Sequence, residues 1–113
     1  MKHEESIIQA AIVRDLSALG VFLFSVPNEA VGGGKNAALR MSRFKAMGLR
    51  PGVTDLVILS QGKVFFMEVK DSTGRLSEHQ KRFRDWCFDW GYLWAIVRSS
   101  EEAINQVRQW GLI

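Results

Sequence analysis

The chain has 113 residues, of which 47% are hydrophobic and 24% are charged. This length suits one domain, residues 1–113, and the composition is ordinary for a soluble globular protein. No apolar run approaches the length of a membrane span and the first residues lack a signal peptide's apolar region, so we expect a cytoplasmic location. The formal charge of +3 favours polyanionic partners only weakly, and the single Cys87 excludes an internal disulfide.

Hydrophobic periodicity and turn residues predict four helices and four strands. The expected helices cover residues 4–19, 37–47, 77–90 and 100–110, and the expected strands cover 21–26, 53–59, 63–70 and 92–97. Ser60-Gln61-Gly62 is typical of a hairpin between the second and third strands. The third strand is apolar on both faces until Glu68, so it should be central. The order predicts an α/β fold, a mixed sheet of about four strands flanked by helices.

The glycine-rich segment 27–36 shares only part of the pattern of a phosphate-binding loop. Glu29 stands where that motif needs a glycine, and Asn36 stands where it needs serine or threonine. We therefore expect a loop that touches nucleic acid or a partner subunit.

Three charged residues stand at the ends of the two hairpin strands. Asp55 opens one strand, and Glu68 and Lys70, two residues apart, point to one face of the other. Asp55 and Glu68 can converge on a cation, the Val69 backbone carbonyl can add a third oxygen ligand, and Lys70 can orient water or neutralise developing charge. Oxygen ligands favour Mg²⁺ or Mn²⁺ over zinc.

Each of these residues also has an ordinary structural explanation. Asp55 could cap a turn, and Glu68 with Lys70 could form a surface ion pair. Taken together, however, such roles would leave unpaired charge at buried sheet positions. The set therefore favours a metal-dependent phosphodiesterase site.

The ordered pattern Pro51-Gly52…Asp55…Glu68-Val69-Lys70 resembles the core of the PD-(D/E)xK nucleases, which have a restriction-endonuclease-like fold. More narrowly, this pattern with Gly74-Arg75-Leu76-Ser77 resembles the VRR-NUC domain, the virus-type replication and repair nuclease, in the stand-alone form that phages encode. The likeness extends from about residue 4 to residue 98 and departs at Thr54, where proline is common. It implies a metal-dependent nuclease, acting in the host cytoplasm if a phage encodes it.

The resemblance also implies two further site residues. Glu5 matches an N-terminal glutamate that often completes the acidic cluster; Glu4 lies about 100° round the helix, so only one of the two can face the site. Gln80 matches a residue that positions water or phosphate. It also forms Ser-x-x-Gln with Ser77, a capping box that needs no function.

Six basic residues are candidates for contact with DNA phosphates, although a charge run is usually a solvated face. They are Arg40, Arg43, Lys45, Arg50, Lys81 and Arg84. The exposed position expected for His79 makes it a weaker catalytic candidate. The four tryptophans mostly follow apolar patterns, and Trp86, Trp90 and Trp94 could leave an apolar patch for a partner subunit.

We expect a structure-selective endonuclease that cuts branched DNA, such as four-way (Holliday) junctions. One site per chain would then call for a homodimer, whose two-fold symmetry suits a four-way junction. Flap cleavage or nonspecific nicking is the alternative activity. A non-catalytic DNA-binding or assembly module that keeps the fold is the alternative from another class.

Overall fold

The computed structural model describes residues 2–27 and 34–113, so most of the predicted glycine-rich loop lies outside the described residues. The helices are α1 (His3–Ala18), α2 (Ala37–Ala46), α3 (Glu78–Asp89) and α4 (Ser100–Gln109). The strands are β1 (Phe22–Ser25), β2 (Leu56–Ser60), β3 (Lys63–Val69) and β4 (Leu93–Val97). All eight predicted elements are present in the predicted order. Within the described ranges, no helix has the length and apolar character needed to cross a membrane.

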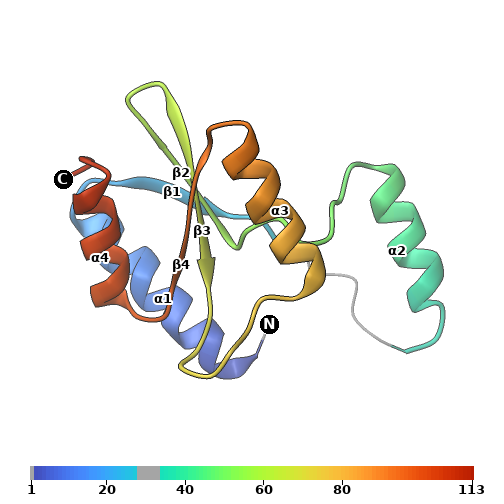
Figure 1. The fold of residues 1–113 in the computed structure, drawn as a ribbon. Helices are drawn as coiled ribbons and strands as arrows, with labels where there is room; N and C mark the ends of the chain where they lie inside the picture. Colours follow the sequence, from blue (N-terminus) through green and yellow to red (C-terminus); the bar gives the residue numbers. More distant parts are fainter. Residues whose placement is uncertain (1, 28–33) are drawn as a thin grey trace.

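The four strands form one mixed sheet in the order β1-β2-β3-β4 (Figure 1). The β1–β2 and β2–β3 pairs are antiparallel, whereas β3 and β4 are parallel and are connected through α3. A parallel pair requires such a crossover, because a tight turn cannot return the chain to the same end of the sheet. The predicted mixed sheet and the internal position of β3 are both confirmed.

The β2–β3 hairpin has a two-residue turn that sets its register. Ser60 pairs with Lys63, and the two residues between them, Gln61 and Gly62, have φ angles of 56° and 73°. Two successive positive φ angles give a turn whose twist matches that of the flanking strands. Counting back from this turn pairs Leu56 with Met67 at the far end of the hairpin.

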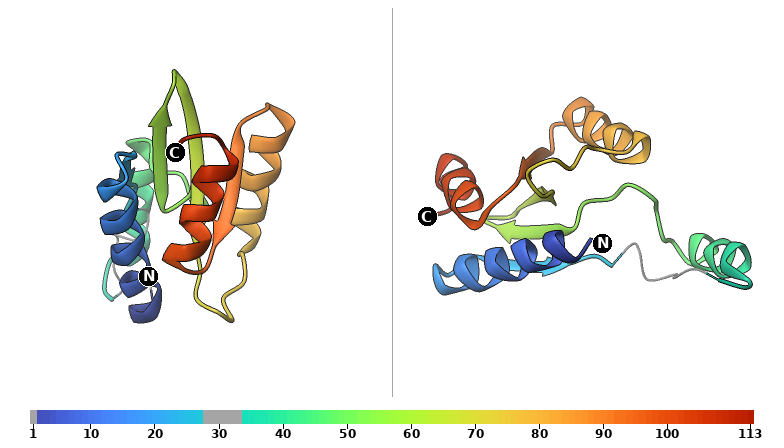
Figure 2. Two further views of the ribbon diagram at one scale, coloured as in Figure 1. Left: turned by 90° about the vertical axis from the view of Figure 1, so that its left-hand side faces the viewer. Right: turned by 90° about the horizontal axis from the view of Figure 1, so that it is seen from below.

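The hydrophobic core lies between one face of the sheet and the helices α1 and α4. Ile12 of α1, Ile58 and Met67 of the hairpin, and Val107 of α4 are fully buried in it. Helix α3 lies on the opposite side of the sheet from α1 (Figure 2), where the Phe83 ring meets the edge of Phe66 at 5.1 Å between centroids. The sheet is therefore covered on both faces near its β3–β4 side.

Helix α2 stands apart from these layers (Figure 1). Among the described residues it buries no side chain and approaches none of the other helices or strands. It extends the molecule along its longest dimension, 45 Å against 31 and 23 Å for the other two. The predicted flanking of the sheet by helices thus holds for α1, α3 and α4, while α2 lies outside the layers.

Candidate active site

The hairpin register places Asp55 directly opposite Glu68. Leu56, the first residue of β2, pairs with Met67, so the position one residue earlier in the chain sets Asp55 against Glu68. Residues opposite each other in an antiparallel pair point to the same face. The backbone ladder ends here, because the Val69 N–H donates to Asp55 Oδ2 at 2.9 Å instead of to a main-chain carbonyl. The two carboxyl groups therefore lie side by side at one end of the sheet.

The Glu68 carboxyl group is buried without any hydrogen-bond donor. Its residue is 1% exposed, and neither oxygen has a hydrogen-bond partner among the described residues. Burial is the main cause that raises the pKa of Glu68 to about 10; the neighbouring Asp55 carboxyl group and the charge of Glu5 act in the same direction, and the charge of Lys70 opposes them. As a carboxylate, Glu68 needs a compensating cation; without one it holds a proton that it can share with Asp55.

The Lys70 side chain and the Glu5 carboxylate meet beside Gly74. A Cβ atom on Gly74 would lie 3.2 Å from Lys70 Cδ and 3.3 Å from Glu5 Oε1. Lys70 follows the end of β3, and its backbone N–H donates to the Val97 carbonyl at 3.1 Å, which extends the pairing with β4. This pairing fixes the point from which the lysine side chain starts.

The structure turns Glu5, and not Glu4, toward the interior. Glu5 is 7% exposed, whereas Glu4 is exposed to solvent. Within residues 2–27 and 34–113, no three acidic, histidine or cysteine side chains are close enough to hold one metal ion between them. Glu5 therefore contributes negative charge near Asp55 and Glu68 without completing a three-carboxylate cluster, and its role as a ligand stays a prediction.

A loop that the sequence patterns do not reveal holds this corner of the site together. Arg98, which follows β4, donates through Nη1 to the carbonyl oxygens of Asp71 and Gly74, the latter at 2.8 Å. The buried Asp71 in turn accepts a hydrogen bond from the Thr73 N–H at 3.1 Å. These bonds hold Gly74 against Glu5 and Lys70. In the sequence, Arg98 is recognisable only as a charged residue directly after an apolar strand. This position does not reveal hydrogen-bond partners 24 to 27 residues away.

Gln80 forms the capping box that the sequence allowed. The Gln80 N–H donates to Ser77 Oγ at 3.2 Å, and Gln80 Oε1 accepts the Ser77 N–H at 2.8 Å. The carboxamide oxygen is thus used at the start of α3. A role for Gln80 in positioning water or phosphate stays a prediction.

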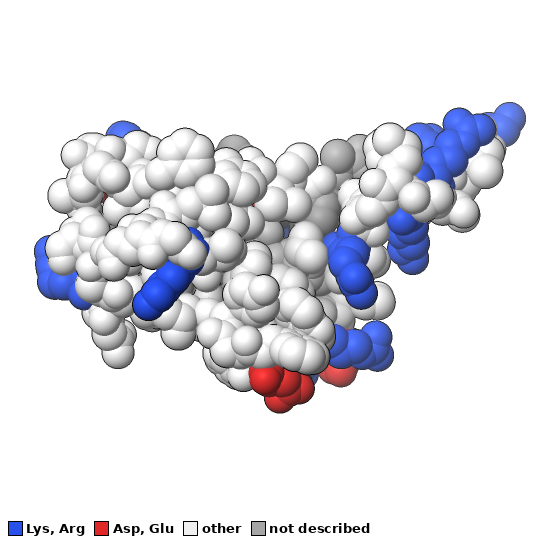
Figure 3. Space-filling view, turned by 90° about the horizontal axis from the view of Figure 1, so that it is seen from above, with Lys and Arg blue, Asp and Glu red and all other residues white. Residues whose placement is uncertain are grey.

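The six basic candidates separate into two groups. Arg40, Arg43 and Lys45 belong to α2, and Figure 3 shows Lys and Arg side chains gathered at that end of the molecule. Arg50 lies beside α3, on which Lys81 Nζ is 3.3 Å from Glu78 and Arg84 Nε is 2.9 Å from Asp85. His79 is exposed, as predicted.

The residues at the end of the hairpin fit a hard divalent cation. Glu68 supplies two oxygen atoms that lack donors, Asp55 supplies a second carboxyl group, and the Val69 carbonyl belongs to the next residue of the chain. Mg²⁺ commonly takes only one or two protein carboxylates and completes its shell with water and phosphate oxygens. The donor set is therefore sufficient without Glu5.

The chain is similar to solved structures of VRR_NUC domains. One, described as "VRR_NUC domain", superposes with a TM-score of 0.65 at 21% identity, covering 96% of this chain and 97% of that chain. Another, a "VRR_NUC domain protein", gives a TM-score of 0.70 at 20% identity, covering 96% of this chain and 88% of that chain. The sequence matches no protein-family model, and no curated protein matches it. At these identities the likeness concerns the fold, and the chain has the VRR-NUC fold that its motifs indicated.

Proposed function

We propose that residues 1–113 form one nuclease domain, a metal-dependent and structure-selective DNA endonuclease that works in the cytoplasm, which is that of the host cell if a phage encodes it. The proposal depends on the Glu68 carboxyl group, which is buried without a hydrogen-bond donor from any described residue, opposite Asp55 and near Lys70. Such a group is costly for stability unless a cation or proton compensates it. The VRR_NUC structures that share the fold support a nuclease.

Each residue of the site has a distinct task in phosphodiester hydrolysis. Asp55, Glu68 and the Val69 carbonyl would hold Mg²⁺ or Mn²⁺, which when bound polarises the phosphate and lowers the pKa of water. The Val69 N–H fixes the Asp55 carboxyl group through Oδ2. Lys70 places a positive charge where the phosphate gains negative charge, and its ammonium group can orient the attacking water. Glu5 and Gln80 are assigned supporting roles, toward the cation and toward the water.

Branched DNA is the substrate that we assign to this site, with a homodimer as the active species. Cutting both strands of a four-way junction needs two sites, and each chain provides one. An apolar strip on the sheet supports association: Phe22 and Phe24 of β1 are 63% and 44% exposed, and Leu59 pairs with Phe22 on the same face. The basic side chains of α2 add a separate surface for phosphate contact.

Cleavage of labelled linear, flap and four-way DNA in the presence of Mg²⁺ or Mn²⁺ tests the proposal. The wild-type protein should cut the four-way substrate fastest, and Asp55→Ala and Lys70→Ala should abolish cutting. Lys63→Ala is the matched control, because Lys63 begins the same strand at its opposite, exposed end. Binding of all three substrates without any cleavage would refute the enzyme and leave a DNA-binding module. A monomeric mass in light scattering at micromolar concentration would refute the dimer.

A further inference from the structure

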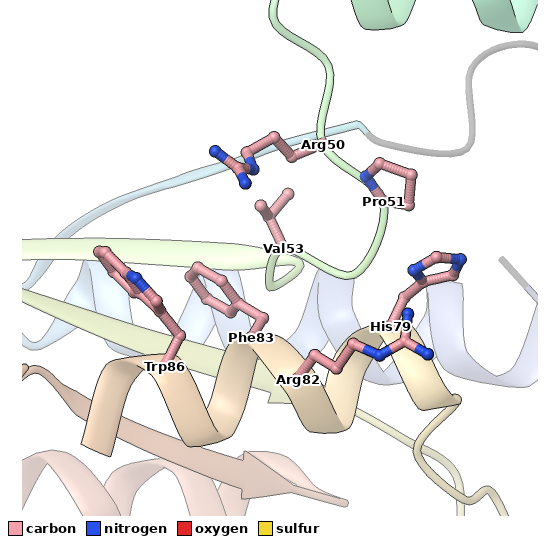
Figure 4. A pocket seen from close by; sticks show the side chains of 7 residues that line it. All are labelled: Arg50, Pro51, Val53, His79, Arg82, Phe83 and Trp86. Atoms are coloured by element: carbon pink, nitrogen blue, oxygen red, sulfur yellow. The ribbon is translucent and has the colours of Figure 1, made fainter. Parts of the chain in front are cut away.

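A hollow with an aromatic wall lies between α3 and the segment that leads into Asp55. It encloses about 430 Å³, within the range typical of small-molecule sites. Its lining combines two aromatic rings, apolar side chains and basic groups: Arg50, Pro51, Val53, His79, Arg82, Phe83 and Trp86. None of these residues is acidic. Figure 4 shows Phe83 and Trp86 rising from α3 toward Val53 and Arg50, with His79 and Arg82 at the end beside Pro51.

The Trp86 ring is held in place by its neighbours and still exposes much of its surface. It is 48% exposed, although it stacks on Tyr92 at 5.6 Å with an interplanar angle of 12°. Phe83 stacks beside it at 6.3 Å and is itself supported by Phe66. An aromatic face that is fixed before binding loses little conformational freedom when a flat ligand stacks on it. Trp86 therefore forms a ready platform for a nucleobase.

The opposite wall of the hollow is fixed by a glycine. Gly52 has a φ angle of +90°, and a Cβ atom there would lie 2.3 Å from the His79 carbonyl oxygen. The turn can thus lie directly on the start of α3 only because residue 52 has no side chain. This contact sets the position of Arg50 relative to Arg82.

The hollow leads toward the candidate active site. An adjoining space of about 310 Å³ shares Arg50, Val53 and Phe83 with it and reaches Thr54 and Phe66. Thr54 directly precedes Asp55, and Phe66 lies two residues before Glu68, on the same face of β3. A nucleotide in the hollow would therefore lie on the face of the sheet that carries the two carboxyl groups.

We propose that this hollow binds one unpaired nucleobase of a DNA strand, stacked on Trp86, with the neighbouring phosphates on Arg50 and Arg82. The inference rests on the proposed nuclease function and makes it more specific. The recognised DNA structure would include an unpaired nucleotide close to the bond that is cut. Aromatic faces with flanking cations are the chemistry by which single strands are held without reading their sequence. Among the described residues the lining contains Arg50 and Arg82 and no acidic side chain, so the hollow is complementary to a polyanion.

Binding of a fluorescent single-stranded DNA oligonucleotide, followed by anisotropy in EDTA to prevent cleavage, tests the proposal. A series of oligonucleotides, each with one abasic position, identifies the base that stacks. Trp86→Ala should weaken binding about tenfold or more, and Trp86→Phe should retain most of the affinity. An abasic site at the position that stacks should lower the DNA affinity of the wild type by a similar factor. It should not lower the affinity of Trp86→Ala any further. Phe88→Ala is the matched control on the same helix, because Phe88 is 57% exposed and does not line the hollow.

Equal affinity of wild type and Trp86→Ala for all the oligonucleotides would overturn the proposal. So would a change from dimer to monomer in Trp86→Ala with unchanged DNA affinity per chain, because the hollow would then be a contact between copies. The nuclease function is refuted by a different result. Base-dependent binding without cleavage of any substrate would contradict the nuclease activity but support the binding of a nucleobase in the hollow. Conversely, cleavage by Trp86→Ala with an unchanged preference for unpaired DNA would refute only the binding of a nucleobase in the hollow.

Discussion

The end of the sheet around Glu68 and the separate helix α2 represent opposite ways of presenting charge. At the sheet end, Glu5, Asp55 and Glu68 are all less than 10% exposed and are held by strand pairing and by the loop bonded to Arg98. Helix α2 carries Arg40, Arg43 and Lys45 and buries none of its residues.

The two regions therefore meet different requirements: phosphodiester hydrolysis needs rigidly positioned groups, whereas attraction of DNA needs only exposed positive charge. A reacting phosphate must be held to within a fraction of an ångström, which requires carboxyl groups fixed in the interior even though burial raises the pKa of Glu68. Attraction to a DNA backbone acts over about 8–10 Å at ordinary salt and needs only exposed positive charge. Under the proposed function, the core layers suit the first purpose, and a helix that packs on none of the other described helices or strands suits the second.

The largest difference between the two regions should appear in the cleavage rate. Glu68→Gln keeps the size of the side chain but removes its charge, so we expect single-turnover cleavage with Mg²⁺ to fall on the order of a hundredfold or more. Lys45→Gln on α2 should change the rate at saturating protein only slightly, because binding is then complete. Comparable losses in both variants would contradict a division of tasks between the sheet end and α2.

Substitutions should also lower the free energy of unfolding more in the layered part of the molecule than in α2. Ile58→Ala leaves a cavity in the fully buried core and should lower the free energy of unfolding by about 2–5 kcal/mol. Leu39→Ala on α2 removes a side chain that is half exposed and should change it by less than about 0.5 kcal/mol. Urea unfolding followed by circular dichroism measures both. A large effect of Leu39→Ala would show that α2 packs against the rest of the molecule.

The dependence of stability on pH should arise at the sheet end, since α2 contains no acidic residue. The Glu68 carboxyl has an ordinary pKa of 4.5, and in the folded protein this pKa is raised to about 10. Between these values the folded chain holds a proton that the unfolded chain has released, so the free energy of unfolding falls as pH rises, by at most ~1.4 kcal/mol per pH unit.

Thermal unfolding in EDTA from pH 5 to pH 9 tests this dependence. The wild type should lose stability with rising pH more steeply than Glu68→Gln, which has no proton to release at this position. Adding Mg²⁺ at pH 8 should stabilise the wild type more than the variant. Parallel pH profiles for the two proteins would contradict the burial of Glu68.

The smallest expected effect concerns the charges of α2. Replacing both Arg43 and Lys45 with alanine should weaken DNA binding to a similar extent for all sequences and reduce the slope of log affinity against log salt concentration by up to about one per residue. Fluorescence anisotropy at several salt concentrations measures the slope. The loss of all binding would mean that α2 carries the recognition of DNA and not only general attraction.

Much of the fold could be predicted because its signals are local. A period of two or about 3.6 residues reveals whether a segment is a strand or a helix, and turn residues mark its ends. In the hairpin, a local signal also has a longer-range effect, because the two-residue turn at Gln61 and Gly62 determines every residue pair along β2 and β3. The sequence placed Asp55 and Glu68 on adjacent strands of this hairpin, and the turn seen in the structure, which includes Gln61 and Gly62 but not Ser60, sets the two residues opposite each other.

Other features depended on contacts between distant segments. Adjacent glutamates at the start of a helix look alike in the sequence, and only the packing of α1 shows that Glu5 is buried while Glu4 is exposed. Ser77 and Gln80 matched a capping pattern, whereas the resemblance favoured a site role for Gln80, and the hydrogen-bond geometry shows the cap.

The sequence by itself determined the order of the elements and the hairpin that brings Asp55 and Glu68 onto adjacent strands, because each follows from neighbours or from one short turn. Only the tertiary structure decided the burial of Glu5, the Arg98 bonds to the loop before α3 and the hollow between Arg50 and Trp86. It also decided that α2 packs on none of the other helices and strands that the structure describes. These features arise where segments far apart in the chain meet, and side-chain volume and hydrogen-bond geometry select among arrangements that local patterns leave equivalent.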